Sequence, residues 1–279
     1  MLWDNNTMQV LDAGAEQEIF PQEVGEGYGL AWSPDSHFLA SVGRADHTIQ
    51  VWNMATHQCE AHILHQCLTY TQHTAQVKAI AWSPDGRSIA SASDDGTVQV
   101  WNAHTMKQLY THRDRGSKVT AIAWSPDGKR LVSGDDNGLI QAWDAFTGAD
   151  LMSYVGHTGA ITSVNWSSDG NCIASSSYDS TVRIWNVATG NSDYLLSNGS
   201  PVFAAIWSPH YHTYLALACY DGSVQVWSIT HQQAGQEVPR YPKRGREQYN
   251  GIFTISWSPG ADQLIAGGHG YILAFKLGD

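Results

Sequence analysis

The sequence predicts an all-β fold made of six repeated units, each a sheet of four short antiparallel strands. Three observations predict it: a composition rich in tryptophan and glycine, a tetrapeptide that recurs at a nearly constant interval, and apolar alternation between turns. The chain of 279 residues contains 12 Trp and 26 Gly, and charged residues make up only 15% of it. Such chains form short strands joined by tight turns rather than disordered segments.

The repeat is marked by the tetrapeptide Trp-Ser-Pro-Asp or a close variant, which occurs six times at steps of 41 to 50 residues. A second tryptophan, or a phenylalanine in the last copy, follows each one 18 to 20 residues later. The tetrapeptides begin at Trp32, Trp82, Trp124, Trp166, Trp207 and Trp257, and the second aromatic residues are Trp52, Trp101, Trp143, Trp185, Trp227 and Phe275.

Within one repeat, alternating apolar residues and turn residues divide the chain into four strands. We expect strands over Val77–Trp82, Ser88–Ser93, Thr97–Trp101 and Met106–Tyr110. Four antiparallel strands in about 42 residues make one blade of a β-propeller, in which radial packing hides the sheet edges. The sequence therefore predicts a single β-propeller domain of six blades, residues 1–279.

These units resemble the repeats of the WD40 family over nearly the whole chain, as an array of the type found in bacteria; Gly156-His157 matches the Gly-His that opens such repeats. The resemblance implies a hydrogen-bonded set of His, Ser or Thr, Asp and Trp in each blade. Two blades carry the full set, with identical spacing: His73, Ser91, Asp95 and Trp101, and then His157, Ser175, Asp179 and Trp185. The physical reason is that a buried indole N–H and a buried imidazole both need partners.

The other blades depart from this set. Arg115 and Asn137 replace His and Asp in the third blade, and the fifth has Asn198 and Leu217. The sixth, which ends on Phe275, keeps almost none of the set. We therefore expect blades 2 and 4 to be the most rigid and blade 6 the least.

The two ends of the chain suggest how the ring closes. The last repeat stops at Asp279, directly after its third strand, whereas Thr7–Asp12 aligns with an outer strand. We expect this N-terminal segment to become the outer strand of the sixth blade, which removes an open edge. Because the sequence starts in mid-repeat and the family usually has seven blades, the alternative is a fragment excised or engineered from a larger, possibly signalling, protein, without activity of its own.

No catalytic motif is present. The sequence lacks Gly-x-Ser-x-Gly, a phosphate-binding Gly loop and His-Glu-x-x-His. The recurring Ser, His and Asp resemble a hydrolase triad only in composition, since each set includes a Trp. We therefore expect no enzyme and no cofactor, and a small-molecule or enzymatic channel is the weakest alternative.

Two segments in the long steps between repeats are unusual. If extended, His57, Cys59, His65 and Cys67 share one face, and these are zinc-ligand types. Because the Cys-x-x-Cys spacing of zinc sites is missing, we expect a decorated strand and no metal. The basic run Arg240–Arg246 is either a solvated loop or a contact for an acidic partner.

WD40 domains usually bind peptides or proteins on the top face of the ring, and the repeat indicates which residues lie there. They are the residue before each turn Asp and the second residue of each first strand. We expect a peptide or partner loop across the channel, with an apolar anchor over blades 4–5; the alternative is that these side chains only cover the channel mouth. The candidate partner-binding residues are aromatic in blades 4 to 6, Tyr178, Phe203, Tyr220 and Phe253, and charged in blades 2 and 3, Lys78, Asp94 and Asp136.

The net charge of −11 argues against binding to nucleic acids or anionic membranes. The N-terminus does not read as a signal peptide, no apolar run is long enough to span a membrane, and four Cys are too few for a disulfide scaffold. We expect a cytoplasmic, monomeric scaffold that binds a protein or peptide partner and is not an enzyme.

Overall fold

The computed structural model describes the chain except for residues 1, 5–6, 12–17, 24–26, 44–46, 55–57, 60–68, 71, 114–116, 211–212, 231–232, 239–250, 269–270 and 277–279. The described residues form strands and turns, as the sequence predicts, and no helix. No helix able to cross a membrane is therefore found among them. The chain divides into two compact units, Met1–Ile122 and Ala123–Asp279.

The first unit contains an N-terminal sheet that the repeat pattern did not predict. It consists of β1 (Leu2–Asp4), β2 (Thr7–Leu11) and β3 (Glu18–Glu23), in that order. We expected the β2 segment to be the outer strand of the sixth blade. Instead β2 pairs with β1 on one edge and with β3 on the other, so that both rows of its backbone hydrogen-bonding groups are in use.

The next sheet holds the first repeat. Its strands are β4 (Gly27–Trp32), β5 (Phe38–Gly43), β6 (Ile49–Asn53), β7 (Gln58–Cys59) and β8 (Thr69–Tyr70). Both β7 and β8 pair with β6, at opposite ends of it. The outer position beside β6 is therefore shared by two short strands, and the three inner strands are intact.

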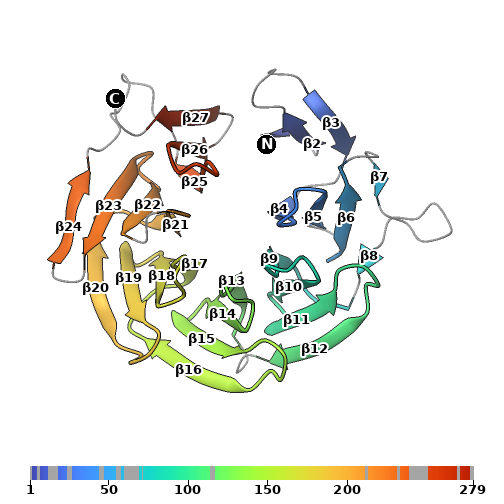
Figure 1. Ribbon diagram of the computed structural model, residues 1–279, viewed down its shortest axis with the longest axis horizontal. Helices are drawn as coiled ribbons and strands as arrows, with labels where there is room; N and C mark the ends of the chain where they lie inside the picture. Colours follow the sequence, from blue (N-terminus) through green and yellow to red (C-terminus); the bar gives the residue numbers. More distant parts are fainter. Residues whose placement is uncertain are drawn as a thin grey trace. The chain divides into compact units, whose positions relative to one another are not determined.

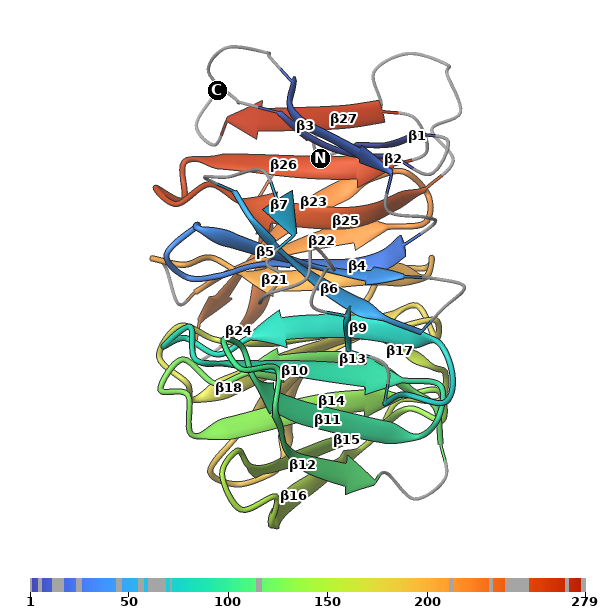
Figure 2. The same cartoon turned by 90° about the vertical axis from the view of Figure 1, so that its right-hand side faces the viewer.

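The second repeat forms a four-stranded antiparallel sheet of β9 (Val77–Trp82), β10 (Ser88–Ser93), β11 (Thr97–Asn102) and β12 (Gln108–Arg113). Figure 2 shows these four strands one beyond another in a twisted sheet. The first three strands confirm the prediction.

The outer strand of this sheet begins two residues later than predicted, and the turn before it explains why. The side chain of Asn102 accepts hydrogen bonds from the backbone N–H groups of His104 and Thr105. Met106 then adopts a left-handed φ of 56°, which no strand residue does. The turn therefore occupies residues 103–106, and β12 starts at Gln108.

In the second unit the same pattern recurs in chain order (Figure 1). Three sheets have four strands each, and the last described sheet has three. The third repeat gives β13 (Val119–Trp124), whose residues fall on both sides of the division between the units, β14 (Arg130–Asp135), β15 (Leu139–Asp144) and β16 (Asp150–Val155). The fourth gives β17 (Ile161–Trp166), β18 (Cys172–Ser177), β19 (Thr181–Asn186) and β20 (Ser192–Ser197). The fifth gives β21 (Val202–Trp207), β22 (Tyr214–Cys219), β23 (Val224–Thr230) and β24 (Gln233–Val238), and the sixth gives β25 (Ile252–Trp257), β26 (Gln263–Gly268) and β27 (Tyr271–Lys276).

All six repeats share one cross-strand register. In each, a fully buried Leu or Ile of the second strand lies opposite the Trp or Phe of the third. This pair joins a large aliphatic and a large aromatic side chain in the core, which is the favourable combination in sheets. The pairs are Leu39–Trp52, Ile89–Trp101, Leu131–Trp143, Ile173–Trp185, Leu215–Trp227 and Leu264–Phe275.

The tryptophan of the tetrapeptide links neighbouring sheets within each unit. The indole N–H of Trp82 donates to the backbone carbonyl of Ala31, at 3.0 Å, in the sheet before it. Trp166 and Trp257 make the same bond, at 3.3 Å, to the carbonyls of Ala123 and Ile206. In these three repeats the tryptophan therefore packs its sheet against the preceding one and satisfies its own N–H there.

Candidate functional site

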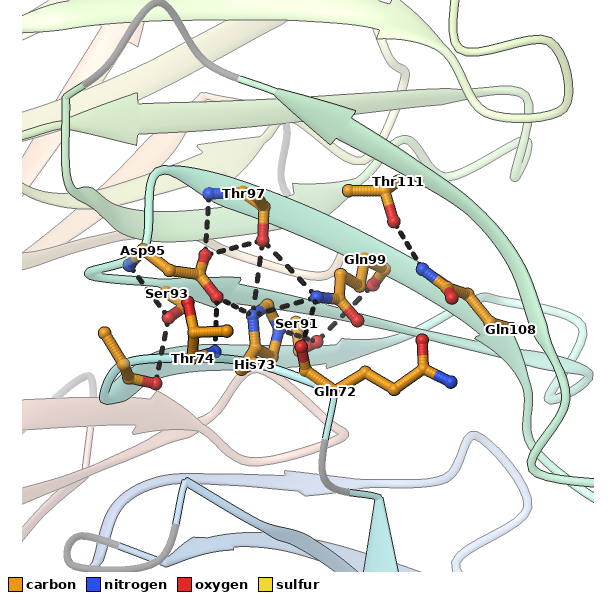
Figure 3. A network of polar contacts seen from close by, with 11 residues as sticks. Gln72, His73, Thr74, Ser91, Ser93, Asp95, Thr97, Gln99, Gln108 and Thr111 are labelled. Atoms are coloured by element: carbon orange, nitrogen blue, oxygen red, sulfur yellow. Dashed lines mark hydrogen bonds and ion pairs between the residues drawn. The ribbon is translucent and has the colours of Figure 1, made fainter.

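Three members of the predicted set of blade 2, His73, Ser91 and Asp95, are joined by hydrogen bonds at one end of its sheet (Figure 3). His73 lies between two partners: its Nδ1 is 2.9 Å from Asp95 Oδ2 and its Nε2 is 2.8 Å from Ser91 Oγ. Asp95 also accepts hydrogen bonds from the backbone N–H of Thr74 and the hydroxyl of Thr97. The network thus connects the turn after β10 to the segment that precedes β9.

Blade 4 repeats this arrangement nearly atom for atom. His157 lies 2.8 Å from both Asp179 Oδ2 and Ser175 Oγ, and the indole N–H of Trp185 donates to the same Ser175 oxygen at 2.8 Å. Thr181 donates its hydroxyl to Asp179. The network therefore ties β18, β19 and the turn between them to the segment that precedes β17.

The charge states in this network follow from burial and hydrogen bonding. Burial lowers the pKa of His157 below its usual 6.5, although Asp179 acts in the opposite direction. Burial alone would raise the pKa of Asp179, but hydrogen bonds from Thr181, from the Thr158 N–H and from His157 outweigh it and hold that pKa at about 2. A neutral imidazole thus faces an ionised carboxylate.

The serine in each network is inaccessible. Ser91 and Ser175 are both 0% exposed, and each hydroxyl lies against an imidazole inside the sheet. A nucleophile must reach its substrate, so these Ser, His and Asp residues support the blade rather than a hydrolytic reaction.

The fifth blade carries a substitute network that sequence reasoning missed. The indole N–H of Trp227 donates to Gln225 Oε1 at 3.0 Å, and Gln225 Nε2 in turn donates to Asn198 Oδ1. An amide can accept on one side and donate on the other, which lets Gln225 replace the Ser and His pair. The signal was available, because a Gln also precedes the Trp by two residues at Gln50, Gln99 and Gln141.

A polar pocket of about 220 Å³ lies beside the blade 2 network. Asp95, which lines it, is already engaged by His73 and Thr97. The volume is below the roughly 300–1,000 Å³ of typical small-molecule sites, and the lining is polar rather than apolar. The lining residues are Gln72, Thr74, Asp95, Thr97, Gln99, Gln108, Thr111 and Arg113.

The four candidate aromatic residues come together in the second unit and form one group, the aromatic cluster: Tyr178, Phe203, Tyr220 and Phe253. Phe203 is the centre, and its ring centroid lies 5.7 Å from Tyr178, 5.9 Å from Tyr220 and 4.8 Å from Phe253. Tyr178 and Tyr220 are 55% and 58% exposed, Phe253 is 36% exposed, and Phe203 is half-buried beneath them. The rings lie at 49° to 84° to that of Phe203, so they surround it instead of stacking flat.

The backbone beneath the aromatic cluster is well supported. The N–H of Tyr178 donates to the Ala160 carbonyl, and that of Tyr220 donates to the Pro201 carbonyl. Between β17 and β21, Ser163 Oγ accepts the N–H of Ala205 at 3.0 Å. These bonds hold the turns and first strands of blades 4 and 5 in fixed positions.

The charged candidates behave differently. In the first unit Lys78 and Lys118 both approach Asp94 Oδ2, each at 3.6 Å, so Asp94 is shared between two ammonium groups. Much of the predicted charge is therefore compensated locally. Asp136 lies in the second unit, half-buried in the turn between β14 and β15.

Two predicted segments lie outside the described residues: the basic run Arg240–Arg246, and the His57–Cys67 segment apart from β7. In the part of the chain that is described, no group of three or more His, Cys, Asp or Glu residues is placed to hold a metal ion.

Comparison with known proteins matches residues 28–193, more than half of the chain, to the family model described as the second β-propeller of echinoderm microtubule-associated protein. The chain is 31% identical over 106 residues to histone acetyltransferase type B subunit 2 of Aspergillus fumigatus, which covers 36% of this chain and 24% of that protein. It is 33% identical over 101 residues to protein HIR1 of Cryptococcus neoformans var. neoformans, covering 36% of this chain and 10% of that protein. It is 35% identical over 78 residues to the probable cytosolic iron-sulfur protein assembly protein Ciao1 of Culex quinquefasciatus, covering 28% of this chain and 22% of that protein.

The matched segments thus span less than a quarter of the length of each of these three relatives. The family model, by contrast, runs through the first four repeats and both complete hydrogen-bonded sets. Together with the shared register of the sheets, it establishes that the chain belongs to the WD40-type β-propellers, in the family described as the second β-propeller of echinoderm microtubule-associated protein.

Proposed function

We propose that this chain is a non-catalytic scaffold that binds a protein or peptide segment through the aromatic cluster. The observation that carries the proposal is that four aromatic residues from three repeats form one exposed group on well-supported turns. Exposed Tyr and Phe side chains lose little conformational entropy on binding and bury a large area, which is why they dominate protein interfaces.

The names of two relatives favour this reading. One is a subunit of a histone acetyltransferase and another is an assembly protein for iron-sulfur proteins. By analogy, this chain holds a partner in an assembly while another component performs any chemistry. The buried serines of the hydrogen-bonded sets and the small polar pocket support the same view.

The proposal includes the whole-chain arrangement expected from the sequence: one monomeric domain, residues 1–279, in which the six repeats are the blades of one ring. It also includes a cytoplasmic location, supported by the free thiols of Cys172 and Cys219. Sedimentation and small-angle scattering test the ring and the monomer, and imaging of a fluorescent fusion tests the location.

The binding surface is tested by affinity capture from cell lysate with a matched control. We expect Tyr178→Ala with Phe203→Ala to lose captured partners, because hot-spot aromatic residues each contribute about 2 kcal/mol or more. The control is Leu151→Ala with Leu195→Ala, which removes two side chains that are each 51% exposed, on the outer strands β16 and β20.

The control variant should capture partners as the unchanged protein does. If the aromatic variant keeps its fold by circular dichroism and still captures every partner, the cluster is not the binding surface. The alternative that the rings only cover the channel mouth would then stand.

A further inference from the structure

The aromatic cluster is bordered by negative charge. Each of its two tyrosines is followed directly by an aspartate, Asp179 after Tyr178 and Asp221 after Tyr220. Asp221 is exposed and accepts hydrogen bonds from the N–H and hydroxyl of Ser223. The cluster therefore presents aromatic faces and carboxylates side by side along the chain.

The charge of Asp179 persists at neutral pH. Its pKa is held at about 2 by hydrogen bonds that outweigh the effect of burial, and the pKa of its partner His157 is lowered by burial. Because the imidazole is neutral, it does not cancel the carboxylate. The turn that carries Tyr178 therefore also carries an ionised carboxylate at the next residue.

This combination favours a cation over an apolar group. The faces of tyrosine and phenylalanine rings attract ammonium and guanidinium groups, and nearby carboxylates strengthen that attraction. An apolar side chain would instead have to displace water from the exposed carboxylate of Asp221 without any compensating contact. The chain as a whole has 26 acidic and 15 basic residues, which also favours a basic partner.

The same unit already contains cations over aromatic rings. The guanidinium carbon of Arg130 lies 4.8 Å from the ring centroid of Trp166, and that of Arg183 lies 5.8 Å from Trp185. Those arginines and tryptophans belong to the same protein. The side chains of Tyr178 and Tyr220, by contrast, are more than half exposed and are accessible to a cation of a partner.

We propose that the aromatic cluster binds the side chain of an arginine or lysine in a basic segment of the partner protein. This inference rests on the proposed function, and it replaces the apolar anchor expected from the sequence by a cationic one. The rings provide the cation–π contact, the exposed carboxylate of Asp221 provides the complementary charge, and the buried carboxylate of Asp179 adds to the negative potential from within the protein.

The test uses three fluorescein-labelled nonapeptides that carry the same uncharged flanking residues and differ only at the central residue, which is Arg, citrulline or Leu. Citrulline keeps nearly the shape of arginine but is uncharged, because a carbonyl oxygen replaces one nitrogen of the guanidinium group. By fluorescence anisotropy we expect the Arg peptide to bind at least about fivefold more tightly than the other two.

Matched variants separate cation–π binding from general attraction to an acidic protein. Tyr178→Leu with Tyr220→Leu keeps apolar surface but removes two π faces, and should abolish the preference for Arg over citrulline. Asp221→Asn should weaken the Arg peptide at least about twofold, whereas Asp193→Asn, at an exposed position of the outer strand β20, should not. Because both tyrosines are more than half exposed, their replacement should leave the fold intact, and melting curves check this directly.

Equal binding of the Arg and citrulline peptides would overturn the inference, as would an Arg preference that survives the Tyr→Leu changes or the absence of binding by all three peptides. Tighter binding of the Leu peptide would also overturn it, but would leave the proposed function in place with an apolar anchor. The proposed function fails separately, in the capture experiment with Tyr178→Ala and Phe203→Ala.

Discussion

The indole N–H groups of the buried tryptophans differ in their partners. That of Trp185 donates to Ser175 inside the blade 4 network. That of Trp207 has no hydrogen-bond partner among the described residues, although the backbone N–H of the same residue donates to the side chain of Asn165. Two tryptophans of similar burial, 2% and 6% exposed, therefore differ by one hydrogen bond.

This difference makes a direct test at the residue scale. Replacing Trp by Phe removes the N–H and a similar amount of apolar area at either position. We expect Trp185→Phe to lower the free energy of unfolding by about 1–2 kcal/mol more than Trp207→Phe, since only the former leaves buried polar partners unsatisfied. Urea unfolding followed by circular dichroism measures the difference; equal losses would mean that the network contributes nothing to stability.

At the scale of the elements, the turn between β14 and β15 must pass very close to the segment before β17. Gly138 adopts a φ of 85°, and a Cβ at this position would lie 2.8 Å from the His157 carbonyl oxygen. Only glycine allows both the left-handed backbone and this approach. The turn of one blade thereby holds the start of the next, which carries the hydrogen-bonded histidine.

Gly199 supplies the matched control, since it has a φ of 70° but no atom within 4 Å of an added Cβ. We expect Gly199→Ala to lower the free energy of unfolding by about 1 kcal/mol, from backbone strain alone. Gly138→Ala should cost at least about 2 kcal/mol more, because the backbone oxygen cannot move aside without disturbing His157. Thermal unfolding of both variants measures this, and equal shifts in melting temperature would show that the close approach is not needed.

For the whole molecule, the hydrogen-bonded sets predict a loss of stability in acid. Burial lowers the pKa of His73 and His157 in the folded state below the usual 6.5. Their contribution to the free energy of unfolding is therefore complete above pH 6.5 and is lost as the pH falls below that value. The pKa of Asp179 is about 2 in the folded state, against an ordinary 3.8, so its contribution to the free energy of unfolding is lost as the pH falls from 3.8 towards 2.

The expected outcome is a melting temperature that falls steadily from pH 7 to pH 5. His73→Gln with His157→Gln should start from a lower melting temperature and show a shallower fall over the same range, because two titrating groups are gone. Differential scanning calorimetry at several pH values measures both curves. Parallel curves would mean that other groups control the acid response.

The strand content and the inner strands of the repeats could be predicted because they depend on local signals, namely apolar alternation and turn residues such as Pro84 and Gly86. The four aromatic candidates could be predicted from their position in the repeat, and the structure brings them together. The pairing of β2 could not be predicted. Several strands with a similar apolar pattern can pair with the same sheet edge, and the sequence pattern does not specify which of them does. The compensation of Asp94 by Lys78 and Lys118 likewise depends on distances between side chains, which sequence spacing does not contain.

The bond from the tetrapeptide tryptophan to the preceding sheet has an evolutionary consequence. Its acceptor is a backbone carbonyl, at Ala31, Ala123 and Ile206, and every residue has one regardless of its side chain. A repeat that keeps its tryptophan can therefore follow any other repeat without a matching change in its neighbour. Gene duplication, deletion and recombination could then shuffle whole repeats, leaving natural selection free to vary the exposed turns that meet a partner.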